Sequence, residues 1–578
     1  MIKKNAITDI GFVLSVAAIC HLLFSQYGFN PTDEGFVLSA TNRVLHGQIP
    51  HVDFSSVRPV GYAYLHIPEL LFSKNYFFQI SRFVFWLEQI LIAYLWFRFL
   101  LKYLKASISM LEEYGFVFSC FIFNVHYFPT SVLHTIDGLL MCMIGLNLVI
   151  ASKKKWNFIG FFFIGFAALC KQNYLVILPF VLFLFGRKNF ILNLIAGIFP
   201  IAFYIGFISF HGGLNDLITQ LGGHNELIKV GLLAYMLNPC FLITFILVFL
   251  LRYKHWHKMS LFILWILIIV LLVTNHYHGK YSFIIIAYIF AELVIGLLKK
   301  YHLLNFIKDE VPLDLSNAIF RDIKIYDENN KQVTDFNDSY NYSIYNDEDI
   351  VLSFITLLIA WSVSISVGYN TPALFIGGCM TWCIINYNKH FVSQKNESPK
   401  SHTISNIIVV LLLASLLIYV RTTNIYRDAK AKDLTYQLDG IVDGACGIRT
   451  NLNTYKVLVE LNLLKKKYPD IIVVPDFTAC NILHSHKSKI LTEWPNKTEI
   501  PNNKILQKVT SKIEKDDTTL VFATPIYQTA LLKDSFTHYN PRYGTEYKIV
   551  YYLVDNFGAV DNTNYFIVFK KVKRRPYL

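Results

Sequence analysis

The sequence predicts a mainly α-helical fold, a polytopic transmembrane bundle of about 13 spans, with a small C-terminal α/β domain. Hydrophobic residues make up 54% of the 578 residues and charged residues only 16%, whereas soluble domains carry charge at about a quarter of positions. Long apolar stretches recur as far as residue 420, with basic residues gathered between them. The segment after Arg421 has an ordinary polar composition. The expected domains are therefore residues 1–421 in the membrane and 422–578 outside it.

The expected spans are apolar segments near the length of about 20 residues that a bilayer requires. The first has no small-residue cleavage site and is not expected to be a removable signal peptide. The thirteen segments cover residues 9–27, 77–97, 114–128, 133–151, 157–170, 173–186, 190–210, 232–251, 259–274, 281–298, 350–367, 371–386 and 404–420.

The basic residues predict the orientation of these spans. All clusters fall on the same side of an alternating topology, which the positive-inside rule assigns to the cytoplasm. The N-terminus is therefore expected inside, and an odd number of spans places the C-terminal domain outside. The formal charge of +13 thus reflects membrane orientation, and no nucleic-acid partner is expected. The clusters are residues 3–4, 98–105, 153–155, 187–188, 252–258 and 299–300.

Two polar regions and the tail complete the expected organisation. Residues 28–76 form the first outer loop, and the Asp- and Asn-rich residues 301–349 form a cytoplasmic insert without helical periodicity. In the tail, Asn453 to Tyr468 reads as a helix with leucines along one face. Apolar runs predict strands at residues 471–474, 519–523, 547–553 and 565–569.

The first outer loop carries the strongest chemical signal. Asn30-Pro31-Thr32-Asp33-Glu34-Gly35 follows the first span, and an apolar-periodic stretch then runs to Gly47. Thr32 is the expected N-cap and Gly47 the expected C-terminal glycine of a short helix. Asp33 and Glu34 would lie in its first turn, where the helix dipole favours ionised carboxylates. Such a carboxylate can take a proton from an attacking hydroxyl, or it can simply complement the dipole.

The continuation of this loop carries a family resemblance. Pro50-His51-Val52-Asp53-Phe54 and Pro59-Val60-Gly61 follow the short helix. Together with the Asp-Glu pair, this order resembles the GT-C glycosyltransferases, multispanning enzymes that use polyprenyl-phosphate-linked sugars, and above all their bacterial mannosyltransferase-like branch. The resemblance covers most of the chain except 301–349. Further agreement lies at Asp137, Lys171-Gln172-Asn173, residues 364–372, and residues 447–450, 475–477 and 493–495.

The resemblance implies roles for particular residues. The acid of the first outer loop is usually the general base, which implies Asp33, with Glu34 as the alternative or as its support. The reaction would be a single inverting displacement at the anomeric carbon, with the lipid phosphate leaving. The charge of that phosphate needs a cationic partner or a metal.

Lys171, Arg58 and His278 are the candidates for binding the donor phosphate. Lys171 can equally be an interfacial lysine whose ammonium reaches out to the headgroups. Asp53 and Asp137 are the tentative metal ligands, joining Asp33 around Mg²⁺ or Mn²⁺.

The expected partners are membrane lipids, a polyprenyl-phosphate-linked sugar donor and an acceptor that is a lipid, a glycan or a protein. The branch also implies a bacterial inner membrane. Two other classes remain open: a ligase or polymerase of lipid-linked glycans, and a transporter or flippase of lipid-linked sugars. A transporter usually shows internal repeats and broken helices at the midplane, whereas here the acids gather in an outer loop.

Overall fold

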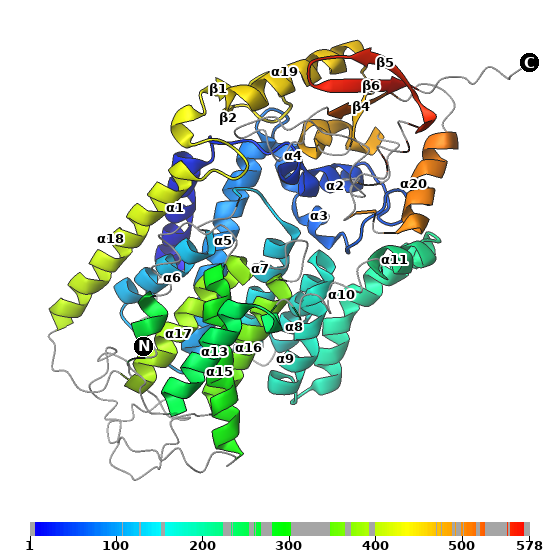
Figure 1. Cartoon of the computed structure of the whole chain (residues 1–578). Coiled ribbons are helices and arrows are strands. Elements are labelled where there is room, and N and C mark those ends of the chain that lie inside the picture. Colours follow the sequence, from blue (N-terminus) through cyan, green and yellow to red (C-terminus); the bar gives the residue numbers. More distant parts are fainter. Residues whose placement is uncertain are drawn as a thin grey trace, which may run out of the picture.

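The computed structural model contains a mainly helical chain with few short strands (Figure 1). Among the described residues, three helices are long and apolar enough to cross a membrane: α1 (Ala6–Phe24), α5 (Phe77–Tyr103) and α10 (Phe190–Phe210). Each lies on an expected span, and their length and composition indicate a membrane protein. The structure describes residues 6–106, 108–125, 129–151, 156–222, 233, 235–253, 259, 262–266, 280–301, 347–364, 372–391, 399–469, 471–474, 477–487, 492, 499–500, 502–515, 521–525, 549, 552 and 555–570.

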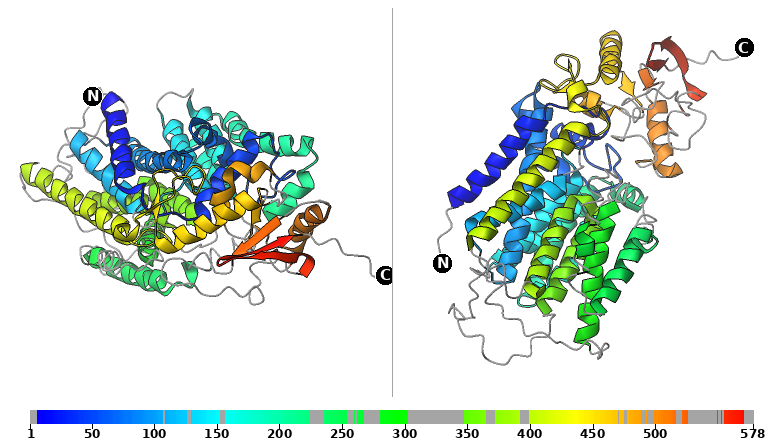
Figure 2. Two further views of the ribbon diagram at one scale, coloured as in Figure 1. Left: turned by 90° about the horizontal axis from the view of Figure 1, so that it is seen from above. Right: turned by 60° about the vertical axis from the view of Figure 1, so that its left-hand side comes forward.

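Other helices lie on most of the remaining apolar segments. Figures 1 and 2 show them packed side by side in one bundle, with α1 and α18 along one edge. Most of the expected span 259–274 and of the polar residues 301–349 lies outside the described residues. The helices on the remaining apolar segments are α6 (Met110–Val125), α7 (His134–Val149), α8 (Asn157–Cys170), α9 (Ile177–Phe185), α13 (Pro239–Tyr253), α15 (Lys280–Lys300), α16 (Asp347–Ser364), α17 (Ile376–Phe391) and α18 (Pro399–Thr423).

Small residues allow the bundle helices to approach closely. A Cβ atom at Gly165 of α8 would overlap the carbonyl oxygen of Gly197 in α10. At Gly145 of α7 it would come within 2.7 Å of the carbonyl oxygen of Gly160 in α8. Backbone contacts of this kind are typical of membrane helices, which associate through close packing because lipid supplies no hydrophobic driving force between them.

The 28–76 segment, expected to be the first outer loop, folds into short helical pieces. The turn η1 (Asp33–Gly35) leads into α2 (Phe36–Leu45), and α3 (Gly61–Leu65) and α4 (Ile67–Phe72) follow. The expected short helix is confirmed; it ends at Leu45, and Gly47 follows two residues later with a φ of 76°. The expected N-cap is wrong, because the Thr32 side chain makes no capping bond. The side-chain oxygen of Asn30 instead accepts the N–H groups of Thr32 at 3.0 Å and Asp33 at 3.4 Å.

The C-terminal segment begins after α18 with a small two-stranded sheet and a helix. Strands β1 (Tyr436–Gln437) and β2 (Arg449–Thr450) pair antiparallel. Helix α19 (Leu452–Lys467) matches the expected helix, and its leucine face is buried. The Asn451 side chain caps it by accepting the N–H of Thr454 at 2.9 Å.

A four-stranded sheet follows in the order β3-β4-β6-β5. Strands β3 (Ile472–Val473) and β4 (Val521–Pro525) are parallel, whereas β6 (Phe566–Lys570) pairs antiparallel with β4 and with the edge strand β5 (Gly558–Asn562). Expected strands at 471–474, 519–523 and 565–569 coincide with β3, β4 and β6. The expected strand 547–553 lies mostly outside the described residues, and its two described residues are helical.

The C-terminal segment packs on the 28–76 segment. The helical turn η8 (Thr478–Lys487) lies against η1 and α2 (Figure 1), and the Ala479 N–H donates to the carbonyl oxygen of Pro31 at 2.8 Å. The rings of His46 and His486 stack with centroids 3.7 Å apart. This packing places residues from both ends of the chain around the Asp-Glu pair. Helices α11 (Leu214–Leu221) and α20 (Asn503–Lys515) also contact the 28–76 segment: Gln220 of α11 and Lys508 of α20 donate to the carbonyl oxygen of His51 at 3.1 Å and 3.4 Å.

Candidate functional site

The carboxylate of Asp33 is held by three side chains. It accepts hydrogen bonds from Asn30 Nδ2 at 3.1 Å and from the Tyr426 hydroxyl at 2.8 Å. Arg427 Nη1 lies 3.2 Å from the same oxygen, Oδ2, and the Asp33 side chain is 16% exposed. Two neutral donors and a cation therefore hold this carboxylate in place, while part of it remains accessible.

Glu34 has a different environment, although it is the next residue. Its two carboxylate oxygens accept from Arg82 Nε at 2.5 Å and Nη2 at 2.9 Å, and both side chains are buried. Arg82 also donates to the carbonyl oxygens of Ser25 and Gly28 at the end of α1. A two-pronged contact of this kind fixes geometry as well as charge. Glu34 therefore positions the turn.

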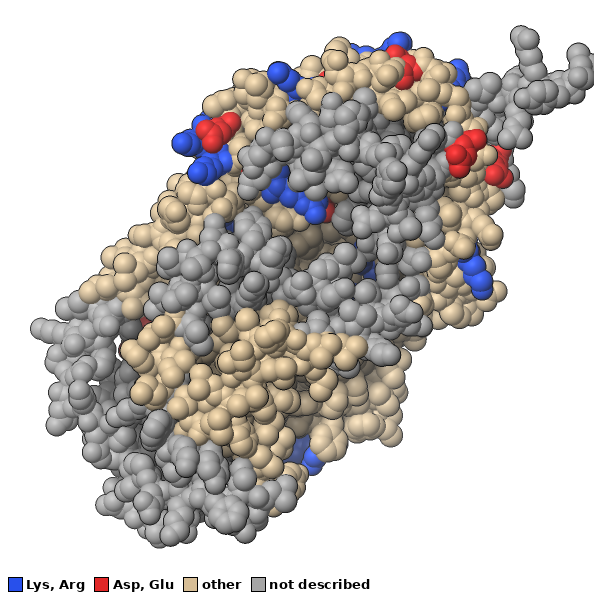
Figure 3. Space-filling view, viewed as in Figure 1, with Lys and Arg blue, Asp and Glu red and all other residues tan. Residues whose placement is uncertain are grey.

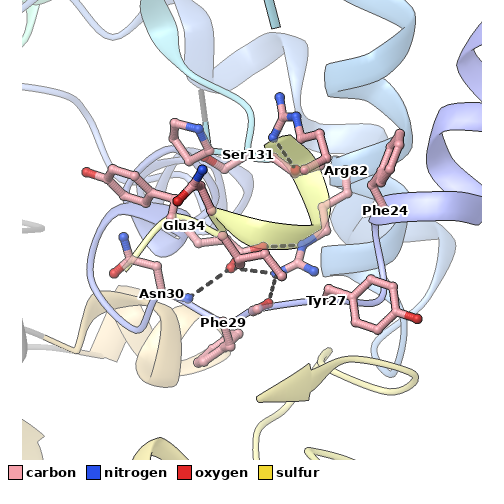
Figure 4. Close-up of a pocket in the computed structure, with 14 residues that line it drawn as sticks. Phe24, Tyr27, Phe29, Asn30, Glu34, Arg82 and Ser131 are labelled. Carbon is pink, nitrogen blue, oxygen red and sulfur yellow. Dashed lines mark hydrogen bonds and ion pairs between the residues drawn. The ribbon is translucent and has the colours of Figure 1, made fainter. Parts of the chain in front are cut away.

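A small cavity of about 40 Å³ lies beside this pair (Figure 4). It has room for a few water molecules. Asp33 does not line the cavity itself, but its hydrogen-bond partners Asn30 and Tyr426 do. The full lining is Phe24, Tyr27, Gly28, Phe29, Asn30, Glu34, Arg82, Pro129, Thr130, Ser131, Arg421, Asn424, Ile425 and Tyr426.

The turn of residues 426–428, directly after α18, organises this site. Tyr426 and Arg427 hold Asp33, and the buried Asp428 carboxylate accepts the backbone N–H of Phe29 at 3.0 Å. Asp428 also accepts from Thr450 Oγ1 at 2.8 Å and Asn451 Nδ2 at 2.6 Å. Burial raises the pKa of Asp428, and these hydrogen bonds oppose that shift. The 426–428 turn thus joins the Asp-Glu pair to the C-terminal segment.

The candidates for phosphate binding lie away from the cavity. The Lys171 ammonium is buried and donates to the carbonyl oxygen of Val363 at 2.8 Å. Burial and the nearby Arg58 charge hold the pKa of Lys171 well below its usual range. Arg58 pairs with Glu499 at 2.7 Å and lies over the ring of Phe36. His278 lies outside the described residues.

The three acids expected around a metal do not converge. Asp53 Oδ2 accepts the N–H of Ile49 at 2.7 Å and so stabilises its own turn. Asp137 is fully buried in the first turn of α7, where it lies beside His66 and Glu88. In the described part of the chain, the residues that group closely enough to hold a metal include neither Asp33 nor Asp53.

Several site residues were not predicted from the sequence. Arg82 did carry a signal, because an ionisable residue inside an expected span is a functional candidate by default. The 426–428 turn carried none, since Tyr426 is 393 positions from Asp33 along the chain. The sequence predicts Arg421 only as the last residue of the transmembrane domain, after the expected span 404–420. It lines the cavity, with Nη1 donating to Thr130 Oγ1 at 3.2 Å and its guanidinium over Trp86.

No protein-family model, curated protein or solved structure matches this chain. The geometry around Asp33 and the resemblance in the 28–76 segment therefore support the functional proposal on their own. That resemblance rests on short motifs and their order along the chain.

Proposed function

We propose that this chain is a membrane glycosyltransferase of the GT-C type. It would move a sugar from a polyprenyl-phosphate donor to an acceptor hydroxyl at the outer face of a bacterial inner membrane. In this proposal the bundle has about 13 spans, and residues 422–578 form an extracytoplasmic domain. One observation supports it most: Asp33, which follows the first apolar helix, is an ion-paired but accessible carboxylate whose hydrogen-bond partners Asn30 and Tyr426 line a cavity.

Asp33 is the proposed general base. The acceptor oxygen attacks the anomeric carbon while its proton passes to Asp33, the bond from that carbon to the phosphate oxygen breaks, and the lipid phosphate leaves with the bonding electrons. The configuration at the anomeric carbon inverts. As Asp33 becomes neutral, the charge of Arg427, 3.2 Å away, is left for the leaving phosphate. The positive charge of Arg427 would thus stabilise the phosphate more strongly in the transition state than in the bound substrate, which lowers the barrier.

The cations at the cavity are better placed for the phosphate than those expected from the sequence. Arg421 lines the cavity and Arg427 pairs with Asp33. Lys171 and Arg58 do not line the cavity, and they contact Val363 and Glu499. The proposal therefore assigns the phosphate to Arg421 and Arg427 first.

A transfer assay tests the proposal. The purified full-length protein in lipid would receive polyprenyl-phosphate sugars and candidate acceptors, as wild type, Asp33→Asn and Glu112→Gln. The control Glu112 is a half-buried acid whose described hydrogen-bond partner is Ser109. We expect transfer by the wild type and the control, and a loss of about 10²-fold or more in Asp33→Asn.

Two results would count against this function. Full transfer by a normally folded Asp33→Asn variant would remove Asp33 as the base. Movement of intact donor across the bilayer without any transfer would instead support a flippase.

A further inference from the structure

A second cluster of ionisable groups lies away from Asp33. It consists of His66, between α3 and α4, with Glu69 of α4, Glu88 of α5 and Asp137 of α7. All four are buried, with exposed fractions of 1%, 3%, 7% and 0%. One ligand atom from each of His66, Glu88 and Asp137 lies within 4.8 Å of the others. The sequence thus brings three carboxyl groups and one imidazole into a single buried site.

The geometry of this cluster fits a metal ion. His66 Nε2 lies 3.1 Å from Asp137 Oδ1. Two ligands at right angles, each about 2.1 Å from one metal, are separated by about 3 Å. On its other side, His66 Nδ1 lies 2.8 Å and 3.0 Å from the two oxygens of Glu69. A carboxylate in this position holds the proton on Nδ1 and turns Nε2 towards a metal, as the second-shell acids of metal sites do.

The cluster also has unsatisfied acceptors. Asp137 Oδ2 and Glu88 Oε2 are buried and have no hydrogen-bond partner among the described residues. A buried carboxylate oxygen without a partner is costly, and the single imidazole balances at most one of the three negative charges. A divalent cation would satisfy both oxygens and most of the excess charge.

We propose that His66, Glu88 and Asp137 bind a divalent first-row transition metal ion, with Glu69 orienting His66. One imidazole nitrogen with carboxylate oxygens suits Mn²⁺ or Zn²⁺, whereas Ca²⁺ sites use oxygen ligands throughout. The metal joins the 28–76 segment to α5 and α7, because the ligands come from these three places. This inference does not depend on the proposed transferase activity.

Metal content tests the site directly. Full-length protein in detergent would be stripped with a chelator, reloaded with Mn²⁺ or Zn²⁺ alone, and assayed by elemental analysis and by its thermal midpoint. The wild type should bind about one ion per chain and gain stability. His66→Gln and Asp137→Asn should lose the ion, and Glu69→Gln should bind it about 10- to 100-fold more weakly.

Glu113→Gln is the matched control. Glu113 is another fully buried acid in the bundle, and it pairs with Arg98 at 3.2 Å outside the cluster. This variant should retain the ion. The site would be refuted if the wild type bound no stoichiometric metal, if folded His66→Gln and Asp137→Asn variants bound it as well as the wild type, or if the control lost it equally.

Discussion

Two adjacent acids show how environment separates the roles of similar residues. Glu34 lies in a buried two-pronged contact with Arg82, whereas Asp33 is partly exposed between Asn30, Tyr426 and Arg427. Removing one partner of a buried pair leaves an uncompensated charge. An accessible carboxylate can exchange a proton with little rearrangement. The sequence placed both acids in one helical turn, and only the tertiary partners distinguish a positioning residue from a proposed base.

Arg82→Lys should destabilise the protein strongly. Lysine keeps the charge but cannot reach Glu34 and the carbonyl oxygens of Ser25 and Gly28 together, because it lacks the planar guanidinium fork. We expect a loss of about 3 kcal/mol or more, seen as a lower thermal midpoint in detergent. Arg98→Lys is the control, because Arg98 is 28% exposed and contacts only the Glu113 carboxylate, at 3.2 Å, and the Tyr94 ring among its described partners. Equal midpoints for the two variants would contradict the structural role of Arg82.

His51 should make stability depend on acidity. Its ring is fully buried between Gln220 and Tyr204, and burial lowers its pKa to about 4. The unfolded chain, with a pKa near 6.5, therefore binds more protons than the folded one between these values. This contribution is fully present above pH 6.5 and is lost as pH falls towards 4, by at most about 3 kcal/mol.

His51→Asn should weaken this acid sensitivity. Asparagine tolerates the positive φ of 67° at this position and carries no titrating group. The measurement is the thermal midpoint of both proteins from pH 7 to pH 4. A wild-type curve parallel to that of the variant would contradict the assignment.

At the scale of elements, apolar runs predicted the positions of the helices, whereas the edge strand, the helix cap and the turn contacts were not predicted. Helices α5 and α10 begin at the expected residues 77 and 190, because turn residues bound long uninterrupted apolar segments. Strand β5 was missed since it is an edge strand with the sequence Gly-Ala-Val-Asp-Asn and no apolar alternation. The cap by Asn30 was missed because Thr32 has the stronger positional signal. Contacts between η1 and the 426–428 turn have no local signature.

Gly35 should control the docking of η8. A Cβ atom at this glycine would overlap the backbone of Ala479 and Thr478, which are not flexible side-chain atoms. Gly35→Ala should therefore separate η8 from η1 and increase protease cleavage in the C-terminal segment. Gly206→Ala in α10 is the control, because nothing lies within 4 Å of its added Cβ. Equal cleavage rates for both variants would show that this close approach is not required.

At the scale of the whole molecule, charge and apolar surface are separated. Among the described residues, Figure 3 shows the charged side chains mostly on the C-terminal segment, with few on the coloured part of the bundle. Helices α1 and α18 expose large apolar side chains such as Ile7, Leu22 and Leu412. An exposed apolar face of this extent suits lipid. The composition of the chain was enough to predict this apolar surface, because the surface depends on how many apolar and charged residues each region contains and not on individual side-chain contacts.

The predicted orientation can be measured with reporter fusions. Alkaline phosphatase folds only outside the bacterial inner membrane, so a fusion after residue 578 should be active and an insertion within residues 301–349 inactive. We expect this orientation because the basic clusters between the spans all fall on one side, which the positive-inside rule assigns to the cytoplasm. A fluorescent protein that matures only in the cytoplasm is the converse control. Active phosphatase at the internal site would contradict the topology.

The central claim is that Asp33 takes the proton of the acceptor hydroxyl and does not merely stabilise the fold of the site. The most direct test measures donor affinity and single-turnover transfer for the wild type and Asp33→Asn in the same lipid preparation. The account predicts that Asp33→Asn binds the donor within a few-fold of the wild type but transfers about 10²-fold more slowly or worse. Equal transfer rates, or a loss fully explained by weaker donor binding, would contradict it.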